Sequence, residues 1–255
     1  MKLNKILIDR LKNKALKLRQ DTFETFIRLG EAHLGGSFSM IEIIISLYER
    51  ILKKNDIFIL SKAHASIPYC LLLREKGYNP KITTHLELDL KNGVQCTTGS
   101  LGHGLPMAVG MALAKKINKK KGFIYVLISD GECQEGTTWE SLLIASKHKL
   151  DNLIILLDYN KIQALDFLED AISLNDIKSK FIAFNTDCFE IKNGHSFPSI
   201  IKIFKKIRSN KRPKVFLFHT IKGKGIKPFE NQPMWHAKKV REAEELIGKR
   251  ELKIK

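Results

Sequence analysis

Two oxygen-bearing side chains occupy matching places in this chain. Asp130 directly follows the apolar run 123–129, and Asn160 comes shortly after the apolar run 153–158. Mg²⁺ prefers oxygen ligands and is usually held by a few protein groups together with substrate phosphates. Asp130, Asn160 and one backbone carbonyl, which we expect to be that of Ile162, would leave positions for two diphosphate oxygens and a water. The pattern predicts a site for Mg²⁺, or for Ca²⁺, that holds a diphosphate.

The elements around these residues support that geometry. The runs 123–129 and 153–158 are continuous and rich in Ile, Leu and Val, which is typical of strands buried on both faces of a parallel sheet. Residues 136–147, between the two runs, are predicted to form the helical crossover that parallel strands require. Ligands of open α/β sheets bind beyond the carboxyl ends of the strands. The predicted fold class is α/β, a doubly wound, mostly parallel sheet with helices on both faces.

A simpler interpretation of Asp130 is a turn. An Asp-Gly pair after a strand is usually only a turn, and Gly131 follows Asp130 here. The second ligand on the neighbouring strand favours a binding site, in which Gly131 would let the backbone approach phosphates because it lacks a Cβ.

Further short segments accompany this unit. In chain order they are HLGGS (33–37), FILSKAHA (58–65), TGSLGHG (98–104), SDG (129–131), QEG (134–136), NKI (160–162), KGKG (222–225) and WH (235–236). Over roughly residues 20–240 they resemble, in the same order, the motifs of the first domain of the transketolase family. Each segment alone is a weak signal, whereas the ordered series is specific.

The resemblance has definite implications for function. Family members use thiamine diphosphate and a divalent cation to transfer a two-carbon ketol unit from a ketose to an aldose acceptor, usually as sugar phosphates. The segments above all belong to the family's diphosphate-binding (PP) domain, and nothing in the 255 residues resembles the pyrimidine-binding domain. We therefore expect the N-terminal subunit of a split transketolase. Its partner would be a C-terminal subunit that carries the pyrimidine-binding domain, in a heterotetramer.

Residue roles follow from the same resemblance. It implies catalytic roles for His33, His64, His85 and His236. It implies cofactor contacts by His64, Gly99, Leu101, Asp130, Gly131, Asn160 and His236, metal ligation by Asp130, Asn160 and Ile162, and a subunit-interface role for Glu135. Imidazoles suit this chemistry because they titrate near neutrality and can move protons on hydroxyl groups.

Some of these roles have simpler alternatives. His64 could be a helix-start histidine satisfied by backbone groups. His85 stands in surroundings that differ from the family's Gly-His-Pro. Glu135 could be an exposed charge in the first turn of a helix, where the dipole favours it. His33 is expected in a glycine-rich turn, where it could approach a small ligand.

The chain also departs from the family pattern at four places. Ser129, Ala63 and Ala237 each replace a glycine, and Leu34 replaces a proline. Each change adds or alters a small side chain beside a cofactor or substrate loop. Because the metal ligands are retained, we expect cofactor binding to persist while the sugar pocket has diverged toward a specialised sugar.

Composition fits one α/β domain over residues 1–255, with an N-terminal helical extension over about 1–30. The hydrophobic content of 44% argues against disorder. Four scattered cysteines without a CxxC argue against a zinc site or a disulfide framework. The chain has no apolar run long enough to span a membrane and no cleavable leader, so we expect a cytoplasmic protein.

The formal net charge of +17 raises a nucleic-acid alternative. The lysine clusters lack interleaved aromatic residues and a recognised binding fold, so a lysine-rich solvated surface, an acidic partner or phosphorylated substrates fit better. Two other classes stay open, namely a 2-oxo acid dehydrogenase α chain and a non-catalytic cofactor-binding protein. The KGKG and WH segments argue against the dehydrogenase.

Overall fold

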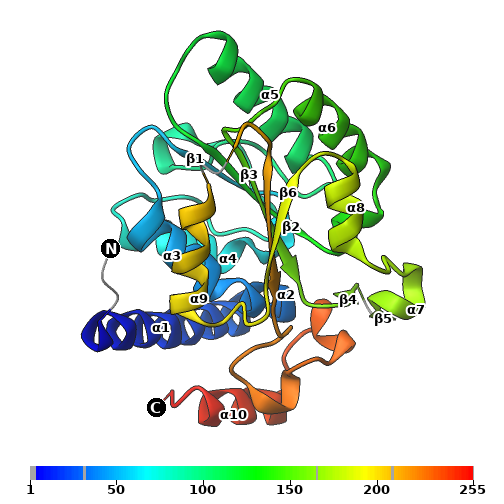
Figure 1. The fold of residues 1–255 in the computed structure, drawn as a ribbon. Helices are drawn as coiled ribbons and strands as arrows, with labels where there is room; N and C mark the ends of the chain where they lie inside the picture. Colours follow the sequence, from blue (N-terminus) through cyan, green and yellow to red (C-terminus); the bar gives the residue numbers. More distant parts are fainter. Residues whose placement is uncertain (1–3, 31–32, 165, 208–209, 255) are drawn as a thin grey trace.

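A five-stranded parallel sheet forms the centre of the molecule (Figure 1). The computed structural model describes residues 4–30, 33–164, 166–207 and 210–254. The sheet has the strand order β1-β2-β3-β7-β6, and a separate two-stranded antiparallel sheet pairs β4 with β5. The strands are β1 (Ile57–Leu60), β2 (Ile124–Ser129), β3 (Leu153–Tyr159), β4 (Ile162–Gln163), β5 (Asp166–Phe167), β6 (Asp187–Ile191) and β7 (Lys214–His219).

Helices cover both faces of this sheet. The α-helices are α1 (Lys5–Leu29), α2 (Leu34–Ser39), α3 (Ile41–Ser46), α4 (Ser66–Glu75), α5 (Gly104–Ile117), α6 (Gly136–Lys147), α7 (Leu168–Ile172), α8 (Ile177–Ala183), α9 (Phe197–Ile203) and α10 (Glu242–Glu251). Short helical segments are the π-helical η1 (Leu47–Ile51) and the 3₁₀ segments η2 (Ala63–Ala65), η3 (Leu90–Asn92), η4 (Gly131–Gln134), η5 (Phe204–Lys206), η6 (Lys227–Phe229) and η7 (Pro233–His236).

Strand side chains alternate between two apolar cores. Tyr125 and Leu127 point into the core shared with α1, α3, α4 and α9, whereas Val126 and Ile128 point into the core shared with α5, α6 and α8. Figure 1 shows these two helix layers on opposite sides of the sheet. Because both strand faces are buried, β2 and β3 are apolar at nearly every position rather than at every second one. The predicted doubly wound parallel fold is confirmed.

The strand register brings the predicted ligands together. Ser129 of β2 pairs with Asp158 of β3, and Tyr159 of β3 pairs with His219 of β7. The residues that follow these pairs, Asp130, Asn160 and Thr220, therefore share one edge of the sheet. The crossover α6 begins and ends at the residues expected from sequence.

One local expectation is wrong. The glycine-rich segment after His33 is the helix α2, not a turn, and His33 is its N-cap residue. Glycine is a poor helix former, but tertiary packing requires it here. A Cβ on Gly35 would lie 2.8 Å from Lys222 Cγ and 3.0 Å from the Trp235 carbonyl oxygen. The glycines of this segment thus permit close packing against the 222–236 loop.

The N-terminal extension is the long helix α1, whose apolar face packs on α3, α4 and α9. Asn4 caps it by accepting a hydrogen bond from the Leu7 amide, and Gly30 ends it with a left-handed φ of 69°. The first three residues of the predicted extension lie outside the described part. Within that part, we find no helix with the length and apolarity needed to cross a membrane.

Candidate active site

A cavity of about 210 Å³ lies at the carboxyl edge of β2 and β3. Its lining includes every predicted catalytic, cofactor-binding and metal-binding residue: His33, His64, His85, Gly99, Leu101, Asp130, Gly131, Asn160, Ile162 and His236. Glu135 does not line it and is exposed at the start of α6. The fold therefore gathers residues from seven separate chain segments at one place.

The three proposed metal ligands are held by local backbone hydrogen bonds. Asp130 Oδ1 accepts from the Gly131 amide at 3.0 Å, and Oδ2 accepts from the Lys161 amide at 2.6 Å. Asn160 Oδ1 accepts from the Ile162 amide at 3.2 Å. These bonds join the end of β2 to the turn after β3.

The donor set fits a hard divalent cation. It offers one carboxylate, one amide oxygen and one backbone carbonyl, which is too few for a closed protein cage but suits Mg²⁺ shared with phosphates. Across the described residues no group of three or more His, Cys, Asp or Glu side chains is arranged to hold a metal. A site rich in His and Cys, as zinc prefers, is therefore not seen there.

Burial sets the electrostatics of Asp130. The side chain is 1% exposed, and burial, with the nearby Asp158 carboxylate, raises its pKa to about 7. A divalent cation at this place would favour the ionised carboxylate. The residue is thus costly to ionise by itself and is stabilised by the charge it is proposed to bind.

Three histidines form a cluster beside these ligands. The ring centroids of His33, His64 and His236 lie 5.3–5.7 Å apart. Burial, together with the Lys62 charge, holds the pKa of His64 well below its ordinary value. Burial and the Lys222 ammonium lower the pKa of His236 to about 3. Both imidazoles are therefore neutral at physiological pH, so each can accept one hydrogen bond and donate one.

Two buried lysines belong to the site although sequence reasoning assigned them no role. Lys222 Nζ donates to the carbonyl oxygens of Ile162 and Ala164, each at 3.2 Å, and lies 3.3 Å from His236 Nδ1. Burial lowers its pKa to about 8. Lys62 Nζ donates to the Gly36 carbonyl at 3.0 Å and pairs with the Asp158 carboxylate. The sequence could have indicated both lysines, because Lys62 lies within the segment FILSKAHA and Lys222 is the first residue of KGKG.

Asp158 is the buried carboxylate that pairs with Lys62. It is fully buried, and it accepts hydrogen bonds from Ser39 Oγ at 2.6 Å, from Thr220 Oγ1 and from Lys62. Burial opposes its ionisation, but the Lys62 charge and these bonds hold its pKa below the ordinary value. Asp158 thereby ties α2, the segment after β1 and the end of β7 to β3.

Glu132 performs a similar task on the other side of the cavity. Its buried carboxylate accepts from the amides of Ser129 at 2.8 Å and Gly102 at 3.2 Å, and from Ser61 Oγ. Burial raises its pKa. Glu132 therefore fixes the 99–104 loop against the end of β2, a role that sequence reasoning missed because it concentrated on Glu135.

Two glycines make room for the histidines. Gly99 has a φ of 148°, and a Cβ there would lie 2.4 Å from Cδ2 of His85. A Cβ on Gly36 would lie 2.9 Å from His64 Nε2. The backbone at both places approaches an imidazole more closely than any other residue type would allow.

The four departures from the family pattern have different surroundings. Ser129 lines the cavity, and its amide and hydroxyl both bond to Glu132. Leu34 and Ala63 are instead buried in the apolar core, and Ala237 is exposed beside the His236 loop. Among these positions only Ser129 borders the described cavity.

The chain belongs to the transketolase family. Residues 12–253 match the model of the transketolase, thiamine diphosphate binding domain. The fold, with its cavity at the strand ends and its histidine cluster, is thus that of a thiamine diphosphate-binding domain.

Two similar proteins are subunits of transketolases. The chain is 38% identical over 242 residues to one subunit of the apulose-4-phosphate transketolase of Actinobacillus succinogenes, covering 87% of each chain. It is 33% identical over 254 residues to the 6-deoxy-6-sulfo-D-fructose transketolase subunit SqwG of a Clostridium species, covering 91% of this chain and 92% of that protein. These relatives are subunits of similar length.

Solved structures give the same fold. The transketolase from Leishmania mexicana superposes with a TM-score of 0.86 at 23% identity, over 95% of this chain and 41% of the other. The chain thus spans about two fifths of the length of that transketolase.

Proposed function

We propose that this chain is the subunit of a two-chain transketolase that binds thiamine diphosphate and Mg²⁺. The observation that carries the proposal is the convergence of Asp130, Asn160 and the Ile162 carbonyl on one cavity, next to two lysines and three histidines. Family membership and the two relatives that are named as transketolase subunits support it. Asp130, Asn160 and Ile162 would hold the cation, and Gly99, Leu101 and Gly131 would border the diphosphate.

When bound, thiamine diphosphate supplies the carbanion and the electron sink for breaking and forming the C–C bond. The chain's own residues hold and orient it. Lys222 and Lys62 place positive charge beside the proposed diphosphate position, which favours an anion in a site shielded from water. The N-terminus of α5, which follows the 99–104 loop, adds a favourable dipole.

The histidines are proposed to handle protons. His64 and His236 are neutral in this structure, and the negative charge of a bound diphosphate would raise their pKa, so a ring nitrogen of either would accept a proton from a substrate hydroxyl and return it later. His33 lies against both rings and would act on the same substrate group. His85, exposed at the cavity mouth against Gly99, is proposed to contact the sugar.

A second chain is proposed to complete the site. Each relative is named as a single subunit of its transketolase. The partner would be a C-terminal subunit with the pyrimidine-binding domain, assembled as a heterotetramer in the cytoplasm. Glu135 precedes α6, where Leu143 and Ile144 are 60% and 48% exposed. These exposed apolar side chains, farther along the same helix, support an interface on α6 and the assignment of Glu135 to it.

The relatives also suggest a substrate class. One is named for a sugar phosphate and the other for a sulfonated sugar. We propose a ketose donor with a terminal anionic group, which the surplus of lysine and arginine favours.

The proposal is tested by reconstitution. The chain is mixed with a candidate partner encoded beside it, and binding of thiamine diphosphate is measured by calorimetry with and without Mg²⁺. Saturable, Mg²⁺-dependent binding with ketol transfer to an aldose acceptor is expected. Binding of the cofactor that is indifferent to divalent cations would contradict the metal assignment.

A further inference from the structure

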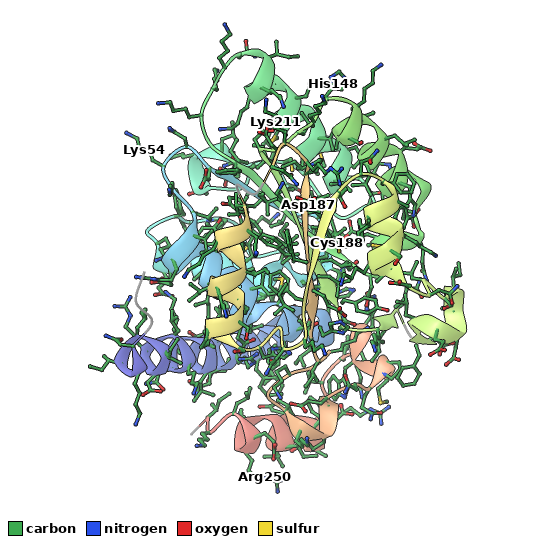
Figure 2. The ribbon with its side chains drawn as sticks, viewed as in Figure 1. Lys54, His148, Asp187, Cys188, Lys211 and Arg250 are labelled. Carbon is green, nitrogen blue, oxygen red and sulfur yellow. The ribbon has the colours of Figure 1, made fainter. Side chains whose placement is uncertain are left out.

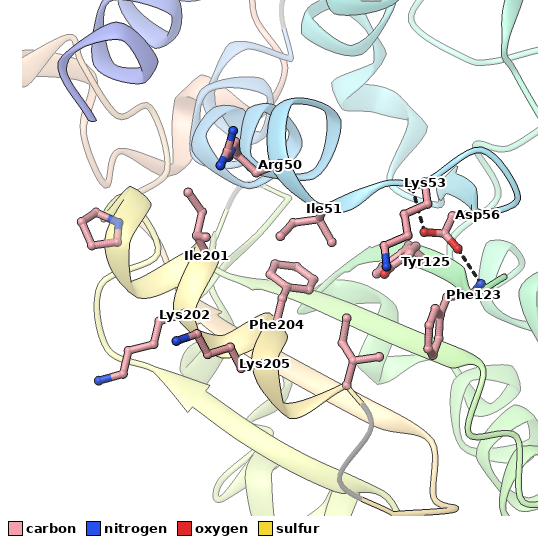
Figure 3. Close-up of a pocket in the computed structure, with 12 residues that line it drawn as sticks. Arg50, Ile51, Lys53, Asp56, Phe123, Tyr125, Ile201, Lys202, Phe204 and Lys205 are labelled. Atoms are coloured by element: carbon pink, nitrogen blue, oxygen red, sulfur yellow. Dashed lines mark hydrogen bonds between the residues drawn. The ribbon is translucent and has the colours of Figure 1, made fainter. Parts of the chain in front are cut away.

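A second cavity, of about 470 Å³, opens at the amino ends of β1 and β2 (Figure 3). It lies between η1 and the α9–η5 segment and shares no lining residue with the candidate active site. Its volume falls in the range of about 300–1,000 Å³ that is usual for small-molecule pockets. Nothing in the proposed transketolase function uses it.

The floor of this cavity is apolar and aromatic. The ring centroids of Phe123 and Phe204 each lie 6.2 Å from that of Tyr125. Ile51 and Ile201 complete the wall from the two sides. Phe204 is held in place by an edge-to-face contact with Phe216 at 5.1 Å. Such a floor accepts a flat apolar body.

The rim of the cavity is cationic. Arg50 and Lys53 come from η1 and the loop after it, and Lys202 and Lys205 come from α9 and η5 on the other side (Figure 3). Within the ranges that the structure describes, none of these four side chains has a hydrogen bond or ion pair. The Nε of Arg50 is buried without an acceptor, which costs free energy unless a ligand supplies one.

The acid in this lining, Asp56, offsets only one of the four positive charges of the rim. Asp56 Oδ2 accepts from the Lys53 amide at 2.9 Å, and Oδ1 accepts from the Phe123 amide at 2.8 Å. Its carboxylate is therefore engaged by the backbone and shapes the loop. With four cationic side chains and one carboxylate, the lining keeps a positive surplus around an apolar floor, which attracts an anion and repels a cation.

We infer that this cavity binds a small aromatic anion, with its ring on Phe123, Tyr125 and Phe204 and its carboxylate, or a similar oxyanion, near Arg50. The guanidinium group matches a planar carboxylate with paired N–H donors. Because the cavity lies at the opposite end of β2 from Asp130, occupancy does not compete with thiamine diphosphate. The ligand site is thus separate from the proposed catalytic one and independent of it.

Titration calorimetry on the full chain tests the inference. The probe is naphthalene carboxylate, and naphthylmethylammonium is the analogue of opposite charge and similar shape. We expect the carboxylate to bind with a Kd below about 1 mM and the ammonium to bind at least about tenfold more weakly. Arg50→Gln is expected to weaken carboxylate binding about fivefold to tenfold, the loss of one charge-assisted pair.

The matched control is Lys54→Gln. Lys54 is exposed next to Lys53 but does not line the cavity, and Figure 2 shows it at the edge of the molecule. Its replacement should leave the Kd unchanged. Lys205→Gln, at an exposed rim residue, provides a second test if Arg50→Gln does not fold. Saturating thiamine diphosphate with Mg²⁺ should not displace the probe.

Three results would overturn the inference. The first is no heat of binding with the carboxylate at millimolar concentration. The second is equal binding of the ammonium analogue. The third is a Kd that neither rim substitution changes, or one that Lys54→Gln changes equally.

Discussion

At the scale of single residues, the proposed active site depends on charges that are buried before any ligand arrives. Asp130 has a raised pKa, Lys222 a lowered one, and His64 and His236 are neutral. Each perturbation originates mainly in desolvation, which also strengthens the interaction of these groups with a bound ion. Perturbed groups that cluster in one cavity are characteristic of functional sites.

Asp130→Ala should abolish Mg²⁺-dependent cofactor binding and leave the fold intact. The side chain provides the only carboxylate of the proposed ligand set, so affinity should fall by more than the roughly 10–100-fold typical of removing an outer-shell partner. Calorimetry measures the affinity, and circular dichroism confirms the fold. Full activity of this variant at saturating cofactor would refute the ligand assignment.

Lys222→Met should weaken thiamine diphosphate binding by about tenfold, because one charge-assisted contact to an anion is removed from a buried place. Lys227→Met, in the same loop but 84% exposed at its side chain, is the control and should bind normally. A Lys222 variant with unchanged affinity would show that this ammonium serves only the backbone carbonyls it contacts.

At the scale of elements, buried polar groups hold the loops of the site against the helices. Arg19 of α1 forms two 2.8 Å contacts with Glu42 of α3 and donates to the Lys224 carbonyl at 2.7 Å. Glu42 also bonds to Nδ1 of His195 at 2.9 Å, whose Nε2 accepts from the Ile221 amide at 2.8 Å. This network fixes the loop that carries Lys222.

The Glu42 network predicts acid sensitivity. Burial alone would raise the pKa of Glu42, but the Arg19 charge and the hydrogen bonds from His195 and Arg19 lower it to about 2. The lowered pKa contributes about 3 kcal/mol to the free energy of unfolding. This contribution is complete above pH 4.5 and is lost as the pH falls toward 2. Urea unfolding should show that the free energy of unfolding falls more steeply from pH 6 to pH 3 for the natural chain than for Glu42→Gln. Parallel pH profiles of the two chains would exclude Glu42 as the source of the acid sensitivity.

Two glycines of α5 give a matched test of packing. A Cβ on Gly104 would lie 2.2 Å from Ser61 Oγ and 2.8 Å from Ser61 Cα, whereas a Cβ on Gly110 would meet nothing within 4 Å. Gly104→Ala should destabilise the chain by about 1–3 kcal/mol through overpacking. Gly110→Ala should stabilise it by about 1 kcal/mol because alanine favours the helix. Thermal unfolding measures both, and equal effects would contradict the packing account.

At the scale of the whole molecule, we propose that the chain contributes one half of a catalytic site. The cavity gathers the groups for a diphosphate and a cation, and the chain spans about two fifths of the length of the transketolase it superposes on. The surplus charge of +17 lies largely on side chains that point outward, such as Lys54 and Arg250 in Figure 2. An acidic partner surface would associate with it faster at low ionic strength.

The purified chain by itself should show no ketol transfer. The proposed division places the group that activates the cofactor ring on the partner, so turnover should appear only when the second chain is added. Activity is followed with a ketose donor and an aldose acceptor while sedimentation reports assembly. Turnover by the isolated chain at the rate of the complex would contradict the two-chain proposal.

The sequence by itself determined the parallel fold, the crossover α6 and the candidate ligands Asp130 and Asn160. These features depend on local patterns, namely apolar runs and the polar residues that end them. They can therefore be predicted from the sequence. The helical state of 34–39 could not be obtained this way, because packing against Lys222 and Trp235 requires a glycine at Gly35, and the approach of His64 requires one at Gly36.

Only the tertiary structure decided which other groups join the site. Lys62, Asp158 and Glu132 acquire their places through hydrogen bonds to residues distant in sequence, and the pKa shifts of the two acids depend on burial that no local pattern records. The aromatic cavity beneath Arg50 likewise joins residues 50–56, 123–125 and 198–207, which meet only when the strands are in register. Both the additional groups of the candidate active site and the aromatic cavity depend on long-range packing and desolvation, which only the tertiary structure shows.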